Sequence, residues 1–202
     1  MQRQVGSMLL RGAAAITVTM LAATALLAQE KPAVAGVPRF PLQVAALYNV
    51  TRSQTIGSTS FWMQGAGMQI EGRFYRGLGA VADINGSHIA AIGSTGVGLD
   101  LVTATFGPRY TWRPARGKYA VYGQALAGEG IGFNSVFPGA AGASSTSFNL
   151  AVKMGGGMNV DMSPHLALRA FEADWVRTEL PNAGSNVQNN LALGAGIVFR
   201  IR

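Results

Sequence analysis

The sequence has no cysteine and little charge, and both absences limit what the chain can be. Without cysteine, disulfide bridges and thiolate metal sites are excluded. Only 12% of the 202 residues are charged, although 49% are hydrophobic. Beyond its N-terminal region the chain nevertheless has no run of roughly 18 apolar residues, the length that a membrane-spanning helix needs. Abundant apolar residues without long apolar runs are typical of strands in which apolar and polar positions alternate.

Eight stretches of the chain show this alternation, and the connections between them are alternately long and short. The long connections are rich in Gly, Ser and Thr, and the short ones hold Gly or Pro. An even number of antiparallel strands, with long loops on one rim and short turns on the other, is the pattern of an outer-membrane barrel. We therefore predict an all-β fold, an eight-stranded antiparallel up-and-down transmembrane β-barrel. The expected strands are residues 42–51, 61–74, 78–87, 98–112, 119–130, 147–160, 165–177 and 187–201.

The N-terminus has the features of a secretory signal. Two arginines accompany the apolar segment 12–27, and small residues allow cleavage after Ala25 or Ala28. Three prolines then resist regular pairing before the first strand. The expected division is a cleaved signal peptide for Sec export over residues 1–28, a periplasmic lead over 29–41 and the barrel over 42–202.

The alternation assigns side chains to two faces. In residues 147–160 the large apolar side chains share one face, and polar residues and glycines share the other. We expect the apolar face to contact lipid and the polar face to line the barrel axis. The same alternation points nine charged residues inward, and we predict that they form a structural ion-pair network: Glu71, Arg73, Asp83, Arg109, Lys153, Asp161, Glu172, Asp174 and Arg200.

Four of these nine residues are basic and five are acidic, so the set is nearly neutral. Buried charges persist when they are paired and hydrogen-bonded, and eight strands leave an interior that side chains fill. We predict a lumen plugged by ion pairs, with Arg109 and Arg73 facing Glu71, Glu172 or Asp174. The alternative for the same residues is the selectivity filter of a narrow pore.

Aromatic residues gather near the ends of the expected strands. Of 17 Phe, Trp and Tyr residues, 12 lie there, with Phe61 and Phe148 among those at the long-loop rim. Aromatic rings favour the two interfaces of a membrane. The predicted girdle includes Tyr48, Trp62, Tyr110, Trp112, Tyr119, Trp175 and Phe199.

Three segments resemble the small outer-membrane barrels of the OmpA/OmpX-like superfamily. They are Gly107–Thr111, the unit of Gly155–Asn159 with Leu168–Asp174, and the closing stretch Asn189–Phe199. Phe199 would fill the role of the aromatic residue on which that family usually ends. The resemblance implies a monomeric, multi-pass protein of the cell outer membrane. Its partners would be outer-membrane lipid and lipopolysaccharide, and the barrel assembly machinery during biogenesis.

The sequence offers little catalytic chemistry. The two histidines, His88 and His165, are expected at opposite rims, which excludes a shared metal site. Ser87-His88, with Glu129 or Glu179 as the acid, imitates half of a lipid A-modifying site, but no nucleophile geometry follows from it. We predict no enzyme activity, no cofactor and no catalytic or metal site.

The basic residues are scattered rather than clustered, which does not favour nucleic acid as a partner. The predicted role is structural or surface-binding, with four loops presented to an extracellular ligand. The alternatives are a narrow pore for ions or small solutes and, third, a lipid A-modifying enzyme of the outer leaflet. A soluble ligand-carrying barrel is the alternative for the fold.

Overall fold

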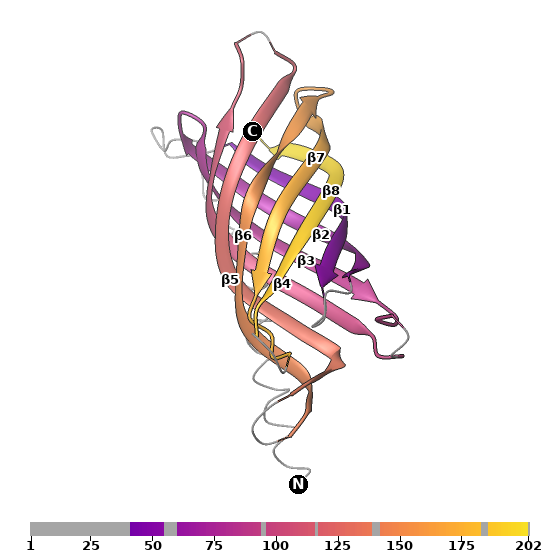
Figure 1. The fold of residues 1–202 in the computed structure, drawn as a ribbon. Coiled ribbons are helices and arrows are strands. Elements are labelled where there is room, and N and C mark those ends of the chain that lie inside the picture. Colours follow the sequence, from indigo (N-terminus) through magenta and orange to yellow (C-terminus); the bar gives the residue numbers. More distant parts are fainter. Residues whose placement is uncertain are drawn as a thin grey trace. The chain divides into compact units, whose positions relative to one another are not determined.

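The computed structural model describes residues 41–54, 60–93, 96–115, 117–138, 142–182 and 186–201. Eight antiparallel strands form one closed barrel, in which each strand pairs with its neighbours in sequence and β8 pairs with β1 (Figure 1). The predicted fold class is confirmed. The strands are β1 (Leu42–Gln54), β2 (Ser60–Tyr75), β3 (Leu78–Ile89), β4 (Leu99–Trp112), β5 (Tyr119–Phe137), β6 (Ser144–Asp161), β7 (Leu166–Thr178) and β8 (Gln188–Ile201).

The expected signal peptide and nearly all of the expected lead lie outside the described residues. No helix in the described part of the chain is long and apolar enough to cross a membrane.

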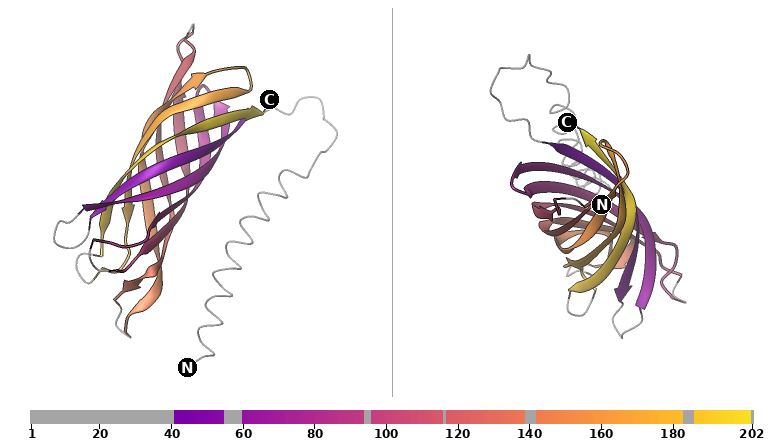
Figure 2. Two further views of the ribbon diagram at one scale, coloured as in Figure 1. Left: turned by 90° about the vertical axis from the view of Figure 1, so that its right-hand side faces the viewer. Right: turned by 90° about the horizontal axis from the view of Figure 1, so that it is seen from above.

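The strands are inclined around the barrel axis (Figure 2). If each residue's partner on the next strand is followed from Val44 on β1 around the barrel, the path reaches Asn189 on β8. Asn189 lies closer to the long loops than Leu191, the partner of Arg52 on β1. The path of paired residues is thus displaced toward the long loops and does not return to Val44. Such a stagger is what closing a sheet into a narrow barrel requires.

Large apolar side chains point outward and polar ones inward, the reverse of a soluble barrel. On β4, Thr103, Thr105 and Arg109 are buried, whereas Phe106 is 63% and Tyr110 is 55% exposed. β6 and β8 repeat the pattern with outward leucines and methionines. Since these strands are apolar outside along most of their length, their outer face suits lipid rather than water.

Apolar side chains also occupy both ends of the interior, which the expectation of a wholly polar axis did not include. Near the long loops, Phe61, Met63, Leu101, Phe137 and Leu180 form a buried cluster. Near the turns, Ala45, Leu47, Ala167 and Val198 form another. The interior is therefore not polar along its whole length.

Three local predictions were wrong. The 131–146 connection is mostly strand, because pairing continues from Phe133 to Phe137 across a register irregularity near Asn134 (φ 54°). Its Gly, Ser and Thr residues hide the alternation from the sequence. Phe61 points inward instead of marking the rim. Tyr48 lies in the middle of β1, because the strand runs on to Gln54.

A β-bulge in β7 changes which residues face inward. Arg169 is the last residue paired with β8 before the register shifts, and Glu172 is the next. Ala170 and Phe171 between them are both exposed, so Arg169 and Glu172 both point inward although they are three residues apart. A bulge places two residues opposite one and so reverses the phase of the alternation.

Candidate functional site

Lys153 on β6 belongs to a buried charge cluster inside the barrel and lies on the side of the cluster nearer the long loops. Its ammonium lies 3.0 Å from Asp83 Oδ1, 3.4 Å from Asp174 Oδ2 and 3.9 Å from Glu172 Oε1. The side chain of Lys153 is 3% exposed, and its three partners are 5% exposed or less. One cation thus faces three carboxylates contributed by β3 and β7.

Glu172 joins this group to two further cations. Arg169 Nη1 lies 2.7 Å from Glu172 Oε2, and the Tyr122 hydroxyl donates a hydrogen bond to the same oxygen. The Tyr122 ring lies below the guanidinium groups of Arg169 and Arg109, at 4.7 Å and 4.1 Å from its centroid. A π-face near two cations is favourable, and more so where water is excluded.

Arg109 on β4 completes the cluster toward the turns. Its Nη1 lies 3.0 Å from Glu71 Oε2, and its Nε donates to Gln124 Oε1 at 3.1 Å. Gln69 links all parts: its oxygen accepts from Arg109 at 2.6 Å and its Nε2 donates to Asp83 at 2.8 Å. These amides satisfy oxygen and nitrogen atoms that the ion pairs alone would leave unpaired.

Glycine makes room for this cluster on β6. A side chain at Gly157 would meet the Tyr122 hydroxyl at 2.6 Å, and one at Gly155 would meet Asp174 Oδ1 at 2.3 Å. Both glycines face inward, opposite Glu172 and Asp174 in the ladder. The Gly155–Gly157 run therefore provides the space into which the charged side chains of β7 extend.

Between Lys153 and the long loops, small polar side chains line an interior space. Thr51, Ser87 and Thr103 border a cavity of about 20 Å³, which has room for about one water molecule. Asn49 Nδ2 and Asn190 Oδ1 are buried nearby with no hydrogen-bond partner in the described part of the protein. The space is closed toward the long loops by the Phe61 and Phe137 cluster.

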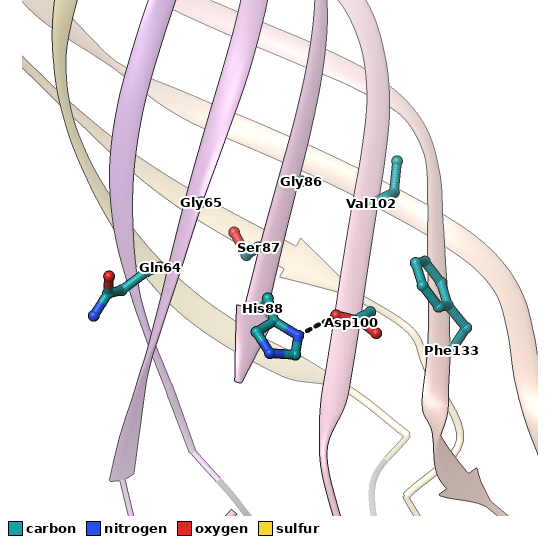
Figure 3. A pocket seen from close by; sticks show the side chains of 8 residues that line it. All are labelled: Gln64, Gly65, Gly86, Ser87, His88, Asp100, Val102 and Phe133. Atoms are coloured by element: carbon teal, nitrogen blue, oxygen red, sulfur yellow. Dashed lines mark hydrogen bonds and ion pairs between the residues drawn. The ribbon is translucent and has the colours of Figure 1, made fainter. Parts of the chain in front are cut away.

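A second candidate site lies on the outer face of the barrel near the long loops. Gln64, His88, Asp100 and Phe133 are successive partners across β2 to β5 and form one row. His88 Nδ1 bonds to Asp100 Oδ1, as Figure 3 shows. Below this row a hollow of about 230 Å³ opens over Gly86.

The barrel is similar in structure to two solved outer-membrane proteins. For Neisserial surface protein A the TM-score is 0.61 at 14% identity, over 79% of this chain and 97% of that chain. For Ail, the attachment invasion locus protein of Yersinia pestis, it is 0.55 at 13% identity, over 81% and 100%. No protein-family model and no curated protein matches the sequence. The chain has the fold of a small outer-membrane β-barrel. The fold that the resemblance implied is confirmed.

In this outer-membrane barrel fold the nine predicted lumen residues fall into two groups. Glu71, Asp83, Arg109, Lys153, Glu172 and Asp174 meet in the central cluster, and Arg73 joins it through Glu71 at 2.8 Å. Asp161 and Arg200 instead pair with each other near the turns, where Arg113 also bonds Asp161. The prediction of one network did not separate these groups.

Four central residues of the barrel were not predicted. Gln69, Tyr122 and Gln124 lie at inward positions of the alternation, but only charged residues were considered. Arg169 was missed because the bulge after it reverses the phase that Glu172 and Asp174 indicate. With Arg169 included, the inward charged residues in the described part of the barrel number five of each sign.

The seven predicted girdle residues are all between 40% and 57% exposed on the outer face. Trp112 and Tyr119 contact each other edge to face across the β4–β5 turn, with centroids 6.4 Å apart. Ser87 and His88 point to opposite faces, since Ser87 is buried and bonds Asn49. The acid beside His88 is Asp100 rather than Glu129 or Glu179.

Proposed function

We propose that the protein is an integral outer-membrane barrel with a closed lumen and a structural or surface-binding role. The observation that carries this proposal is the reversed polarity: large apolar side chains outside, and ion pairs buried inside. Water would not stabilise such an outer face, whereas the hydrocarbon of a bilayer would. β1 begins and β8 ends at the rim that carries the short turns. With that rim in the periplasm, the four long connections at the opposite rim would face out of the cell.

This part of the proposal is tested by membrane fractionation and gel mobility. The folded barrel should stay with the outer membrane and migrate faster before boiling than after it. A chain that is extracted without detergent, or whose mobility is unchanged by boiling, would refute the membrane assignment.

Three interior layers support a closed lumen. The Phe61 and Phe137 cluster lies near the loops, the Lys153 and Arg109 cluster lies in the centre, and a second apolar cluster packs inside β1, β7 and β8 around Leu47. The central ion pairs would have to separate before an ion passed, which leaves unpaired charges in a poorly hydrated interior.

Planar-bilayer recordings of the purified protein test the closed lumen. We expect no steady conductance. Steady channels whose ion selectivity changes in Arg109→Glu would support the narrow pore instead, because only a residue lining an open path changes selectivity.

We also propose that the barrel is not an enzyme. His88 and Asp100 are paired on the outer face, but Ser87 is on the other side of the sheet. A hydrolase needs its nucleophile within hydrogen-bond reach of the base. Mass analysis of lipid A from cells with and without the protein should give the same species. A new deacylated or acylated species would contradict this.

The long connections favour an uncharged ligand over an anionic one. One solved structure of Ail contains the heparin analogue sucrose octasulfate. In this chain the connections 87–97 and 131–146 have no Lys or Arg, and 52–60 has only Arg52. Such loops give little electrostatic attraction for a polyanion. A glycan-array screen should therefore show no preference for sulfated glycans, and salt-sensitive binding of them would refute this reasoning.

A further inference from the structure

The hollow on the outer face lies where apolar and polar rows of side chains meet. Its floor includes Gly86 and Val102, which are partners on β3 and β4. The next row toward the loops is Gln64, His88 and Asp100, with Phe133 beside it (Figure 3). Gly86 has no side chain in the floor row, and this leaves the recess.

The polar row offers a ligand two polar groups, a histidine ring nitrogen and a side-chain amide. Asp100 accepts from His88 through Oδ1 and from Asn134 through Oδ2, so its carboxylate is occupied. His88 Nδ1 is engaged with Asp100, so Nε2 is the ring nitrogen left for a ligand. Gln64 Oε1 accepts from the Tyr48 hydroxyl at 3.0 Å, which leaves the amide N–H groups as donors. A hydroxyl or an amide, which both donates and accepts, complements this pair.

The charge of the rim excludes a phosphate as its main ligand group. The row contains a carboxylate and no Lys or Arg, and an anion beside Asp100 would be repelled. The apolar floor in turn suits hydrocarbon. The ligand should therefore combine a sugar or amide group with an acyl chain directly attached to it.

We propose that this hollow binds the acylated sugar of an outer-leaflet glycolipid. The first methylene groups of an acyl chain lie on Gly86 and Val102, and a sugar hydroxyl or its acyl amide bonds His88 and Gln64. This proposal depends on the orientation given under the proposed function, in which the long-loop end faces the outer leaflet.

Gly86→Val tests the hollow without disturbing the strand. A Cβ at Gly86 would meet only Ala66 O and Val102 Cγ2, both at 4.0 Å, and valine suits a strand. The matched control is Gly72→Val on β2. Gly72 also faces outward, near the turn end, and an added Cβ there meets nothing within 4 Å.

The probe is lipid A, with phosphatidylglycerol as the comparison lipid that has acyl chains and a phosphate but no sugar. Affinities for the full-length protein in detergent are measured by native mass spectrometry. Loss of the recess or of a rim hydrogen bond should weaken lipid A binding about tenfold or more in Gly86→Val and His88→Ala, and not in Gly72→Val. Phosphatidylglycerol should bind more weakly than lipid A and equally to all four proteins.

Equal lipid A affinity in Gly86→Val and Gly72→Val would overturn the proposal. So would a parallel loss of phosphatidylglycerol binding, which would show that the hollow holds an acyl chain alone. Gel mobility before boiling is recorded for each variant. If the Gly86→Val barrel shows the same change in gel mobility on boiling as the wild type and binds lipid A equally well, only the proposed binding hollow is refuted. If the protein needs no detergent, the membrane assignment itself is refuted.

Discussion

Lys153 is the cation whose removal should affect the barrel most specifically. Its ammonium is within 4.0 Å of Asp83, Glu172 and Asp174, and all four side chains are nearly inaccessible. Lys153→Met keeps most of the length and the apolar character of the stem, and it removes the ammonium with its charge and its hydrogen bonds to Asp83. Asp83 would then have only the Gln69 amide as a hydrogen-bond partner among the described side chains.

Removal of one partner of a buried ion pair costs about 3–5 kcal/mol, because the other charge stays buried and unpaired. With a urea slope of roughly 2 kcal/mol per M, that destabilisation lowers the unfolding midpoint by about 2 M. The exposed pair Arg177–Glu179, at 3.2 Å with about 40% exposure of each side chain, provides the control. Arg177→Met should cost less than about 1 kcal/mol, since surface pairs contribute little.

The assay is urea unfolding from lipid vesicles, followed by tryptophan fluorescence and by gel mobility. The three tryptophans are all on the outer face, so their emission reports contact with lipid. Asp83→Asn should restore part of the stability lost in Lys153→Met, because it removes the unpaired charge. A midpoint in Lys153→Met no lower than in Arg177→Met, or no recovery in the double variant, would refute the argument that the ion pairs are essential to the fold.

Two further predictions concern the same cluster. Tyr122→Phe removes the hydrogen bond to Glu172 but keeps the ring below both guanidinium groups. In the same urea assay it should lower the free energy of unfolding by about 1–3 kcal/mol. An unchanged unfolding midpoint would mean that the hydroxyl is not needed. Deletion of Ala170 removes the extra residue of the bulge and keeps Arg169 and Glu172 inward, whereas deletion of Ala173 reverses the alternation on one side of it. Only the first deletion should give a heat-modifiable barrel, and equal folding of both would contradict the assigned bulge.

Alternation and loop rhythm were enough to predict the eight strands and their order. Such information is local, because neighbouring strands are joined by the chain and successive side chains point to opposite faces. The ends were less accurate where composition hides the pattern. The extension of β5 to Phe137 occurs in a Gly-, Ser- and Thr-rich segment, where pairing with β6 rather than side-chain polarity maintains the strand.

The lumen was predictable only where strict alternation holds. Glu71, Arg109 and Lys153 follow it and could be assigned to the interior from parity alone. Arg169 could not, because an unpaired residue between it and Glu172 leaves no mark in the sequence. The predicted nine had one more acidic residue than basic residues, and Arg169 makes the two signs equal in number.

The inward charges also explain why the barrel has one register. A slip of one residue on any strand turns its inward side chains to the lipid face. For β4 or β6 that would expose Arg109 or Lys153 to hydrocarbon, at about 2–4 kcal/mol for a cation near the bilayer midplane. The partners left inside would lose their ion pairs as well, so both costs add for a single slip. An all-apolar interior would lack this penalty, and the glycine-rich β6 offers little side-chain packing of its own to resist slipping. On this reasoning the buried charges specify the pairing of the strands, and the bulge in β7 is the adjustment that brings the fifth cation into the same interior.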